Sequence, residues 1–242
     1  MGGDTIFDAD IAATYDTDHG RTDPAVIAAT VGTLSQLAAE GPALEFAIGT
    51  GRIALPLRAT GVPVSGIEIS QAMVDQMRAK PDGNAIDVFI GDMCTAQVPG
   101  AFSLVFLVFN TIDNLTSQSA QLACFENAAR HLAPGGRFVI ETQVPPLTRL
   151  SPGETRLAFA RSDRHWGIDE FDLTTQSYTS HHLWMTENGS KRLSVPFRYV
   201  WPSELDLMAR IAGMRLEHRW ADWSQRSFTA EAGFHVSVWR KD

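Results

Sequence analysis

The sequence has few cysteines and no long apolar run. Only Cys94 and Cys124 occur among 242 residues, which makes a disulfide framework implausible and favours a reducing compartment. No apolar run approaches the roughly 20 residues that cross a bilayer. The first residues also lack the basic and apolar regions of a signal peptide. We therefore expect a cytoplasmic protein with no membrane partner.

Clusters of basic residues and of metal ligands are missing as well. Lysine and arginine number 20 against 28 acidic residues, the net charge is −8, and no basic run occurs. Because nucleic acids and anionic membranes are bound by clustered lysine and arginine, we expect neither partner. No histidines and cysteines share the spacing of metal ligands, so we expect no metal. The acidic balance favours a small-molecule substrate.

The residues that are present predict an open, mostly parallel α/β sheet. Hydrophobic residues make up 44% of the chain and charged residues 20%, a normal balance for one domain over residues 1–242. Two N-terminal helices are predicted within 1–41, over 8–15 and 24–40. Strands are predicted over 44–48, 62–69, 86–90, 102–109 and 137–141, and helices over 52–59, 70–80 and 117–132. This alternation over 42–145 implies parallel pairing with right-handed crossovers.

The pattern changes over residues 155–201. Short runs at 157–160, 167–173, 176–186 and 192–200 alternate in polarity, and Asn188-Gly189 is a strong hairpin signal. We expect an antiparallel insertion that shapes a substrate pocket and offers one contact for a homodimer. Residues 202–242 then predict a last helix, from Pro202 to Gly213, and an antiparallel strand pair over 216–220 and 235–239.

A glycine turn and an acid indicate the kind of ligand. Gly49 and Gly51 follow the first strand of the alternating region, and Glu68 ends the second. Ligands of open α/β sheets bind at the carboxyl ends of the strands, where a carboxylate can accept hydrogen bonds from a ribose diol. The turn matches a dinucleotide fingerprint, which is weak alone. Glu45 inside the first strand and Asp92 after the third are unusual for a nicotinamide cofactor.

Taken in order, five motifs resemble those of class I S-adenosylmethionine-dependent methyltransferases. They are E-F-A-I-G-T-G-R at 45–52, G-I-E-I-S at 66–70, G-D-M at 91–93, L-V-F-N-T-I-D-N-L at 107–115 and L-A-P-G-G-R-F-V-I-E at 132–141. The resemblance implies a doubly wound, seven-stranded Rossmann-like sheet. It also implies transfer of a methyl group from S-adenosylmethionine to a nitrogen or oxygen atom of a small molecule, leaving S-adenosylhomocysteine.

The resemblance also implies where the cofactor lies. Residues 47–51 would lie under its methionine and ribose, Glu45 would order this turn or act through water, and Glu68 would bind the ribose. Residues 69 and 73 would pack on adenine, 92–93 would hold its edge, and 109–111 would form the floor near the sulfonium. The full expected set is Tyr15, Glu45, Ala47, Gly49, Thr50, Gly51, Glu68, Ile69, Met73, Asp92, Met93, Phe109, Asn110 and Thr111. The family commonly has glycine in place of Ala47, and alanine is a conservative change in volume.

No residue can be assigned as catalytic from the sequence. A sulfonium methyl is already activated, so the protein mainly holds a nucleophile in line, and an amine can lose its proton to water. The candidates are Tyr15, which with Asp16 matches a pair that closes over the cofactor in relatives, Asp113 and His182. Each also has a structural alternative. Tyr15 could be a core residue, Asp113 could form an Asx-type turn or a helix cap, and His182 could be a surface or core histidine whose hydrogen bonds are satisfied within the protein.

Two other functions stay open. A nicotinamide-dependent oxidoreductase would use the same glycine turn, but no Tyr-x-x-x-Lys pair and no hydride-chemistry residue is found. A cofactor-binding protein without catalysis is not excluded by any residue. Asp92 likewise has an even alternative, in which it caps the next helix instead of binding adenine.

Overall fold

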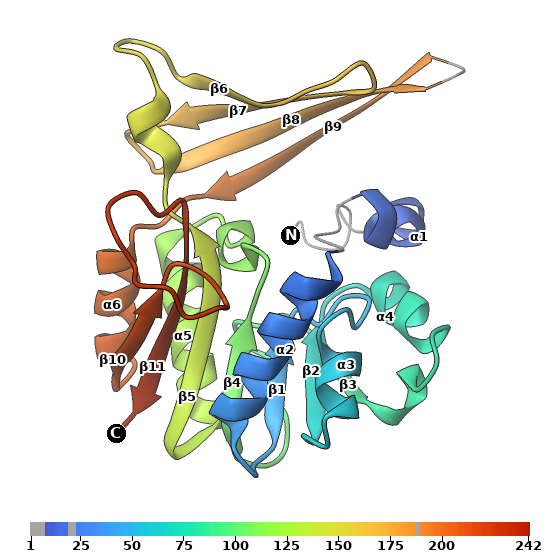
Figure 1. Ribbon diagram of the computed structural model, residues 1–242, viewed down its shortest axis with the longest axis vertical. Helices are drawn as coiled ribbons and strands as arrows, with labels where there is room; N and C mark the ends of the chain where they lie inside the picture. Colours follow the sequence, from blue (N-terminus) through green and yellow to red (C-terminus); the bar gives the residue numbers. More distant parts are fainter. Residues whose placement is uncertain (1–7, 19–22, 187–188) are drawn as a thin grey trace.

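The computed structural model describes residues 8–18, 23–186 and 189–242. Its centre is a seven-stranded sheet in the order β10-β11-β5-β4-β1-β2-β3 (Figure 1). The strands are β1 Ala43–Phe46, β2 Val64–Glu68, β3 Asp87–Ile90, β4 Phe102–Leu107, β5 Leu132–Gln143, β10 Met214–Trp220 and β11 Phe234–Lys241. The first five pair in parallel, and β11 runs antiparallel to both β5 and β10. The predicted fold class is confirmed.

The central strand β4 shows why the sheet is covered on both faces. Leu104 and Phe106 belong to one hydrophobic cluster, while Val105 and Leu107 belong to another. Because successive side chains of a strand point to opposite faces, an unbroken apolar run requires two covered faces. Helices α2 Pro24–Ala38 and α3 Ala54–Ala59 cover the first face, and α5 Gln118–His131 and α6 Pro202–Ile211 cover the second.

Polar caps set the beginnings of three helices at or near the predicted positions. Asp23 accepts a hydrogen bond from the amide of Ala25 at the start of α2. Ser70 caps α4 Gln71–Arg78, and Ser117 caps α5 in the same way. Such caps satisfy amide groups that lack partners in the first helical turn. Helix α3 begins at Ala54 instead of the predicted residue 52, because the turn that precedes it extends to Ile53.

One predicted turn is wrong. Residues 134–136 lie within β5, not between α5 and the strand. The pairing of β4 with β5 changes register here, since Phe102 pairs with Leu132 and Leu104 with Arg137. The segment Pro134-Gly135-Gly136 therefore forms a bulge inside the strand. Regular pairing is interrupted at a bulge, so proline and glycine are tolerated there.

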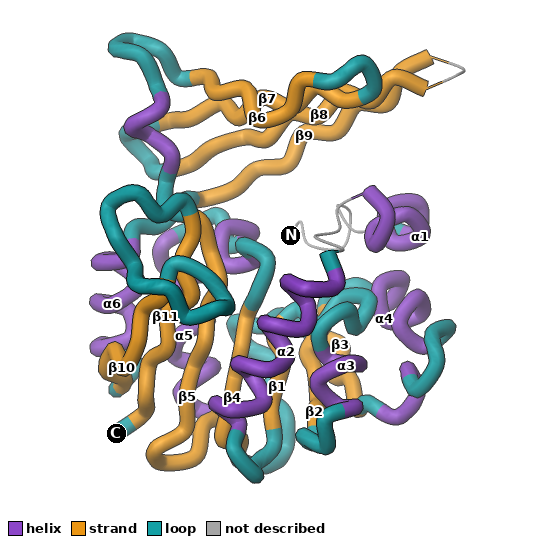
Figure 2. Tube along the Cα trace, in the orientation of Figure 1, coloured by secondary structure: helices purple, strands orange, loops and turns teal. Residues whose placement is uncertain are grey.

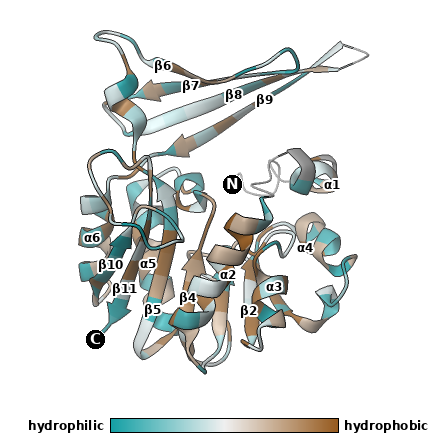
Figure 3. Ribbon diagram, in the orientation of Figure 1, coloured by the Kyte–Doolittle hydropathy of each residue, from teal (hydrophilic) through white to brown (hydrophobic). Residues whose placement is uncertain are grey.

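The predicted insertion is a separate antiparallel sheet. It contains β6 Arg156–Arg161, β7 His165–Asp172, β8 Ser177–Thr186 and β9 Gly189–Arg198 in that order. The sheet lies above the edge at which the parallel strands end, as Figure 2 shows. The tip of the predicted hairpin, 187–188, lies outside the described residues, but Thr186 pairs with Gly189 as the hairpin requires. Figure 3 shows that hydrophobic residues concentrate in central strands of the larger sheet such as β4 and β2, whereas β10 and β11 are more hydrophilic.

The remaining elements are short. Helix α1 Ala9–Asp18 lies close to α4, and three 3-10 helices occupy Gly83–Ala85, Thr111–Asn114 and Pro146–Arg149. Within the described ranges, no helix is both long enough and apolar enough to span a membrane.

Two glycines test the packing of this fold in opposite directions. A Cβ added at Gly66 in β2 would lie 2.5 Å from Cδ1 and 2.8 Å from Cβ of Ile48, whereas one at Gly32 in α2 meets nothing within 4 Å. We expect Gly66→Ala to lower the free energy of unfolding by about 1–3 kcal/mol through overpacking. Gly32→Ala, the control, should raise it by roughly 0.5–1 kcal/mol through helix propensity. Urea denaturation measures both, and equal stability of the two variants would contradict the packing described for Ile48.

Candidate functional site

The turn after β1 has left-handed backbone at three positions. The φ angles are +52° at Ala47, +56° at Gly49 and +74° at Gly51. Glycine adopts such angles freely, whereas an L-residue there costs roughly 1–2 kcal/mol. The presence of alanine at position 47 is therefore conservative in volume but not in backbone energy. The turn keeps its shape because neighbouring groups hold it.

Glu68 is the main group that holds the turn. Its Oε2 accepts a hydrogen bond of 2.8 Å from the amide of Gly49, and its Oε1 accepts bonds of 2.9 Å from the amides of Ile69 and Ser70. The side chain is only 5% exposed, so it is not a solvated acid at a strand end. Burial raises the pKa of Glu68, and the three amide bonds oppose this shift.

A second buried acid lies next to Glu68. Glu45 in β1 is 3% exposed, and its Oε2 has no hydrogen-bond partner among the described residues. Burial raises the pKa of Glu45 well above its usual range, and the charge of Glu68 adds to the effect. Two carboxyl groups at one place favour a ligand that carries positive charge, because a nearby cation lowers the cost of ionising both.

Both acids line a cavity of about 560 Å³ at the carboxyl ends of β1, β2 and β4. This volume lies within the range of small-molecule and cofactor sites. Twelve of the fourteen expected cofactor residues line it: Tyr15, Glu45, Ala47, Gly49, Thr50, Glu68, Ile69, Met73, Asp92, Met93, Phe109 and Thr111. The other two, Gly51 and Asn110, belong to the turns behind the lining. Pro196 of β9 also lines the cavity, so the antiparallel sheet contributes to it.

Helix α1 is fastened over the glycine turn by Asp16. This carboxylate accepts hydrogen bonds from Thr50 Oγ1 at 2.6 Å, Lys80 Nζ at 2.5 Å and Arg52 at 3.3 Å. Burial opposes ionisation, but the bonds from Lys80 and Thr50 outweigh it and lower the pKa of Asp16. No role was predicted for Lys80 or Arg52 from the sequence, because no local sequence pattern indicates that they lie beside Asp16.

Arg52 lines one wall of the cavity, where its guanidinium contacts the aromatic rings of Tyr15 and Phe109. Its guanidinium carbon lies 5.4 Å from the centre of the Tyr15 ring and 5.1 Å from that of Phe109. Both distances are those of cation–π contacts. Burial raises the pKa of Tyr15, and Arg52 partly offsets the shift, so the phenol is neutral at ordinary pH. Arg52 lies within the glycine fingerprint, and that position was the one available signal of its role.

Asp92 combines two interpretations that the sequence left even. The described residues between β3 and β4 form no helix, so Asp92 caps a turn and not the helix that the sequence suggested: its Oδ1 accepts a hydrogen bond of 2.8 Å from the amide of Cys94. It also lines the cavity, together with Met93. The cap uses one of the roughly four lone-pair positions of the carboxylate, so the side chain can still accept a bond from a ligand.

Asp113 does not line the cavity. It lies behind it and is 1% exposed. Its Oδ2 accepts hydrogen bonds from Asn110 Nδ2, Gln143 Nε2 and the hydroxyl of Tyr178 in β8, while Oδ1 has no partner among the described residues. Burial outweighs these three donors and raises the pKa of Asp113 to about 7. Asp113 therefore joins the larger sheet to the antiparallel one.

His182 lies in the antiparallel sheet and does not line this cavity. Its Nδ1 is 3.0 Å from Nε2 of His165, and the rings of His165, His182 and Trp184 form a cluster with nearly parallel planes and centroids 4.9–5.2 Å apart. His181 points to the other face of β8, where it contacts Ser194 and Glu170. Within the described part of the chain, no three histidine, cysteine or acidic side chains are grouped as metal ligands.

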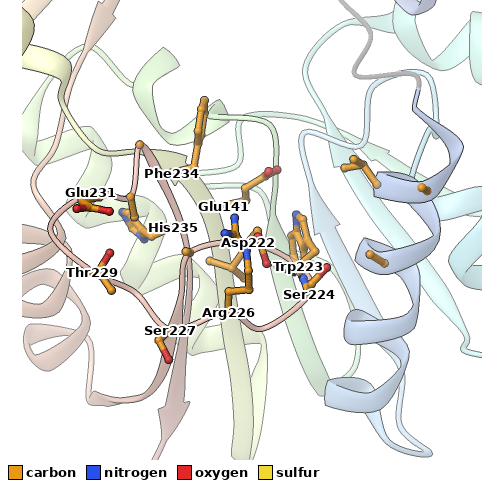
Figure 4. A pocket seen from close by; sticks show the side chains of 17 residues that line it. Glu141, Asp222, Trp223, Ser224, Arg226, Ser227, Thr229, Glu231, Phe234 and His235 are labelled. Carbon is orange, nitrogen blue, oxygen red and sulfur yellow. Dashed lines mark hydrogen bonds and ion pairs between the residues drawn. The ribbon is translucent and has the colours of Figure 1, made fainter.

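A second cavity was not predicted from the sequence. It measures about 690 Å³ and lies between the start of α2, the end of β5 and the connection from β10 to β11 (Figure 4). Glu141, Asp222, Trp223 and His235 are among its lining residues. Burial, followed by the charge of Arg219, lowers the pKa of His235 to about 3 and keeps its ring neutral. The connection carries no motif by which the sequence could have indicated it.

A glycine turn held by a buried acid, at the carboxyl edge of a doubly wound sheet, defines a protein that binds a nucleoside-containing cofactor. Residues 43–136 match the family described as methyltransferase domain. The CcbJ methyltransferase from Streptomyces caelestis is 36% identical, covers 96% of both chains and has a TM-score of 0.84. The chain belongs to the class I S-adenosylmethionine-dependent methyltransferases, and S-adenosylmethionine is its cofactor.

Other similarities are weaker. The amino pentose methyltransferase CalS10 from Micromonospora echinaspora is 20% identical, with 98% of both chains covered and a TM-score of 0.70. The sugar N-methyltransferase KedS8 from Streptoalloteichus sp ATCC 53650 is 21% identical, with 94% and 93% covered and a TM-score of 0.67. These two show the shared fold. A curated relative, an uncharacterized RNA methyltransferase of Parasynechococcus marenigrum, is 39% identical over 61 residues, which are 25% of this chain and only 13% of that protein.

Because the pKa of the buried acid Asp113 is raised, we expect the stability of the protein to depend on pH. Between about pH 4 and pH 7 the unfolded chain releases this proton while the folded chain keeps it, so the free energy of unfolding falls as the pH rises. A pKa raised from 3.8 to about 7 corresponds to a loss of at most roughly 4 kcal/mol by pH 8. Asp113→Asn mimics the protonated acid and should remove this part of the pH dependence. Urea titrations of both proteins at pH 5 and pH 8 measure it, and parallel losses in the two proteins would contradict the assignment.

Proposed function

We propose that the protein transfers a methyl group from S-adenosylmethionine to an amino nitrogen of a small molecule. The observation that carries the proposal is the cofactor cavity, where a glycine turn, two buried carboxyl groups and a half-buried aromatic wall come together. The described lining of this cavity includes no histidine, the pKa of Tyr15 is raised, and we assign its three carboxyl groups, Glu45, Glu68 and Asp92, to the cofactor. A hydroxyl acceptor would gain from a base, whereas an amine reaches its nucleophilic form by losing a proton to water.

The names of structural neighbours support nitrogen as the target. CalS10 is named as an amino pentose methyltransferase and KedS8 as a sugar N-methyltransferase. The neighbour MtfA, 15% identical, is named as a glycopeptide N-methyltransferase. A small acceptor also agrees with the net charge of −8. The cytoplasmic location and the homodimer contact stay predictions.

The residues of the cavity fit the parts of the proposed cofactor. Glu68 already accepts three amide bonds, so about one of its four lone-pair positions remains, and it lies on Oε2. We therefore assign Glu68 one direct hydrogen bond to the ribose, not two. The orphan Oε2 of Glu45 fits a positively charged ammonium group, directly or through water. Ile69, Met73, Asp92 and Met93 are assigned to adenine.

The chemistry needs little from the protein beyond binding and orientation. When bound, S-adenosylmethionine supplies a methyl group that its sulfonium already activates. The glycine turn and Glu68 hold the donor, while Phe109 and Arg52 close one wall against water. The antiparallel sheet, through Pro196, borders the side from which an acceptor can approach. Holding the two reactants in line is the main contribution to rate. Asp113 and His182 have no direct role in this scheme.

Replacing Glu68 tests the cofactor site. Glu68→Ala should weaken binding of S-adenosylhomocysteine by about 1–3 kcal/mol, because it leaves the ribose and the Gly49 amide unpaired. Isothermal calorimetry measures the affinity. Glu217→Ala is the matched control, since it breaks an ion pair with Arg137 of 2.6 Å that involves no residue of the cavity. Equal affinity of the Glu68 variant and the wild type would refute the assignment.

A screen of matched acceptors tests the nitrogen target. Each pair contains an amine and its hydroxyl counterpart, such as 3-amino-3-deoxy-D-glucose and D-glucose, and formation of S-adenosylhomocysteine is measured. We expect turnover with amines alone, and a rate that rises with pH toward the pKa of the amine, because only the free base attacks. Transfer to the hydroxyl partners instead would assign the enzyme to oxygen.

A further inference from the structure

The turn after β4 has an unfavourable backbone conformation. Phe109 and Asn110 are consecutive residues with φ angles of +57° and +64°, in the left-handed region. Neither is glycine, and an aromatic residue is rare at such an angle. Strained backbone of this kind persists only where the surroundings impose it, and it concentrates at ligand sites. The groups that impose it are therefore of functional interest.

The constraint comes from one short stretch of the neighbouring strand β5. The amide of Phe109 donates a 3.0 Å hydrogen bond to Oε2 of Glu141, and the amide of Asn110 donates a 3.2 Å bond to the carbonyl of Glu141. The side chain of Asn110 accepts further bonds from Thr142 Oγ1 at 2.6 Å and from the amide of Gln143 at 2.7 Å. The Glu141 carboxylate holds the first strained residue, and residues 142–143 hold the second.

The strained turn aims one ring at the cofactor cavity. Phe109 lines that cavity, and its ring faces the guanidinium of Arg52 at 5.1 Å. If the backbone at Phe109 relaxed to a negative φ, the Cβ direction would change and the ring would leave this wall. Glu141 is itself buried and lines the second cavity, as Figure 4 shows, so it acts from behind the wall.

We propose that Glu141 is a positioning residue for methyl transfer. Its carboxylate fixes the left-handed conformation of Phe109, and through it the aromatic wall beside the reacting end of the cofactor. A carboxylate is suited to this role, because a hydrogen bond from an amide to a charged acceptor is stronger than one to a neutral acceptor. The inference rests on the proposed cofactor site and is independent of which atom accepts the methyl group.

A double-mutant cycle tests whether Glu141 acts through Phe109. The probe is S-adenosylhomocysteine, measured by calorimetry with wild type, Glu141→Ala, Phe109→Ala and the double variant. Glu141→Ala should weaken binding about tenfold in the wild-type background, and less than about twofold when residue 109 is alanine. Glu141→Gln keeps an acceptor oxygen and should show an intermediate loss of about threefold.

The outcomes are separable. If Glu141→Ala weakens binding equally in both backgrounds, or if Glu141→Gln loses as much as Glu141→Ala, the positioning role is overturned. Should the alanine variant fail to fold, Glu141→Met takes its place in the cycle, since it fills a similar volume without an acceptor oxygen. Failure of the nitrogen proposal appears elsewhere, as absent turnover of amines, while the binding cycle still reports on Glu141.

Discussion

The buried carboxylate of Glu68 is the contact on which the rest of the site depends. It accepts the Gly49 amide from one strand–helix turn and the Ile69 and Ser70 amides from the next. These bonds join the ends of β1 and β2, two neighbouring strands whose carboxyl ends border the cavity. Because the acid is buried, losing any of the bonds would leave polar groups unpaired in a site of low dielectric constant. The proposed ribose contact is therefore added to a group that is already structural.

Charge is distributed around the cavity in a way that suits a cationic sulfonium cofactor. Glu45 and Glu68 lie buried on the floor, and the cation Arg52 is held between two rings at one wall. Asp16, Lys80 and Thr50 fasten helix α1 over the same turn. The site therefore combines a rigid floor, made by strand ends, with a cover made by a short helix. The strained Phe109–Asn110 turn, held from β5, completes the wall between the cofactor cavity and the second cavity.

Most of the floor could be predicted from the sequence, because it depends on local patterns. Gly49, Glu68 and Asp92 each follow an apolar run, and parallel strands bring their carboxyl ends to one edge. Residue 47 shows the limit of this reasoning, since its left-handed backbone cannot be seen in its volume. Asp113 shows another limit. The sequence shows that Asp113 follows the strand that became β4, but its burial against Tyr178 depends on how the antiparallel sheet docks on the larger one.

By itself the sequence determined the order of the elements, the parallel core and the class of cofactor, because apolar periodicity, caps and glycine turns act over a few residues. Only the tertiary structure decided which distant side chains meet. Glu141 and Phe109 are 32 residues apart, Lys80 and Asp16 are 64 apart, and Tyr178 and Asp113 are 65 apart. Such contacts follow from strand order and from the docking of one sheet on another. No local pattern encodes either, since both result from burying many apolar surfaces at once.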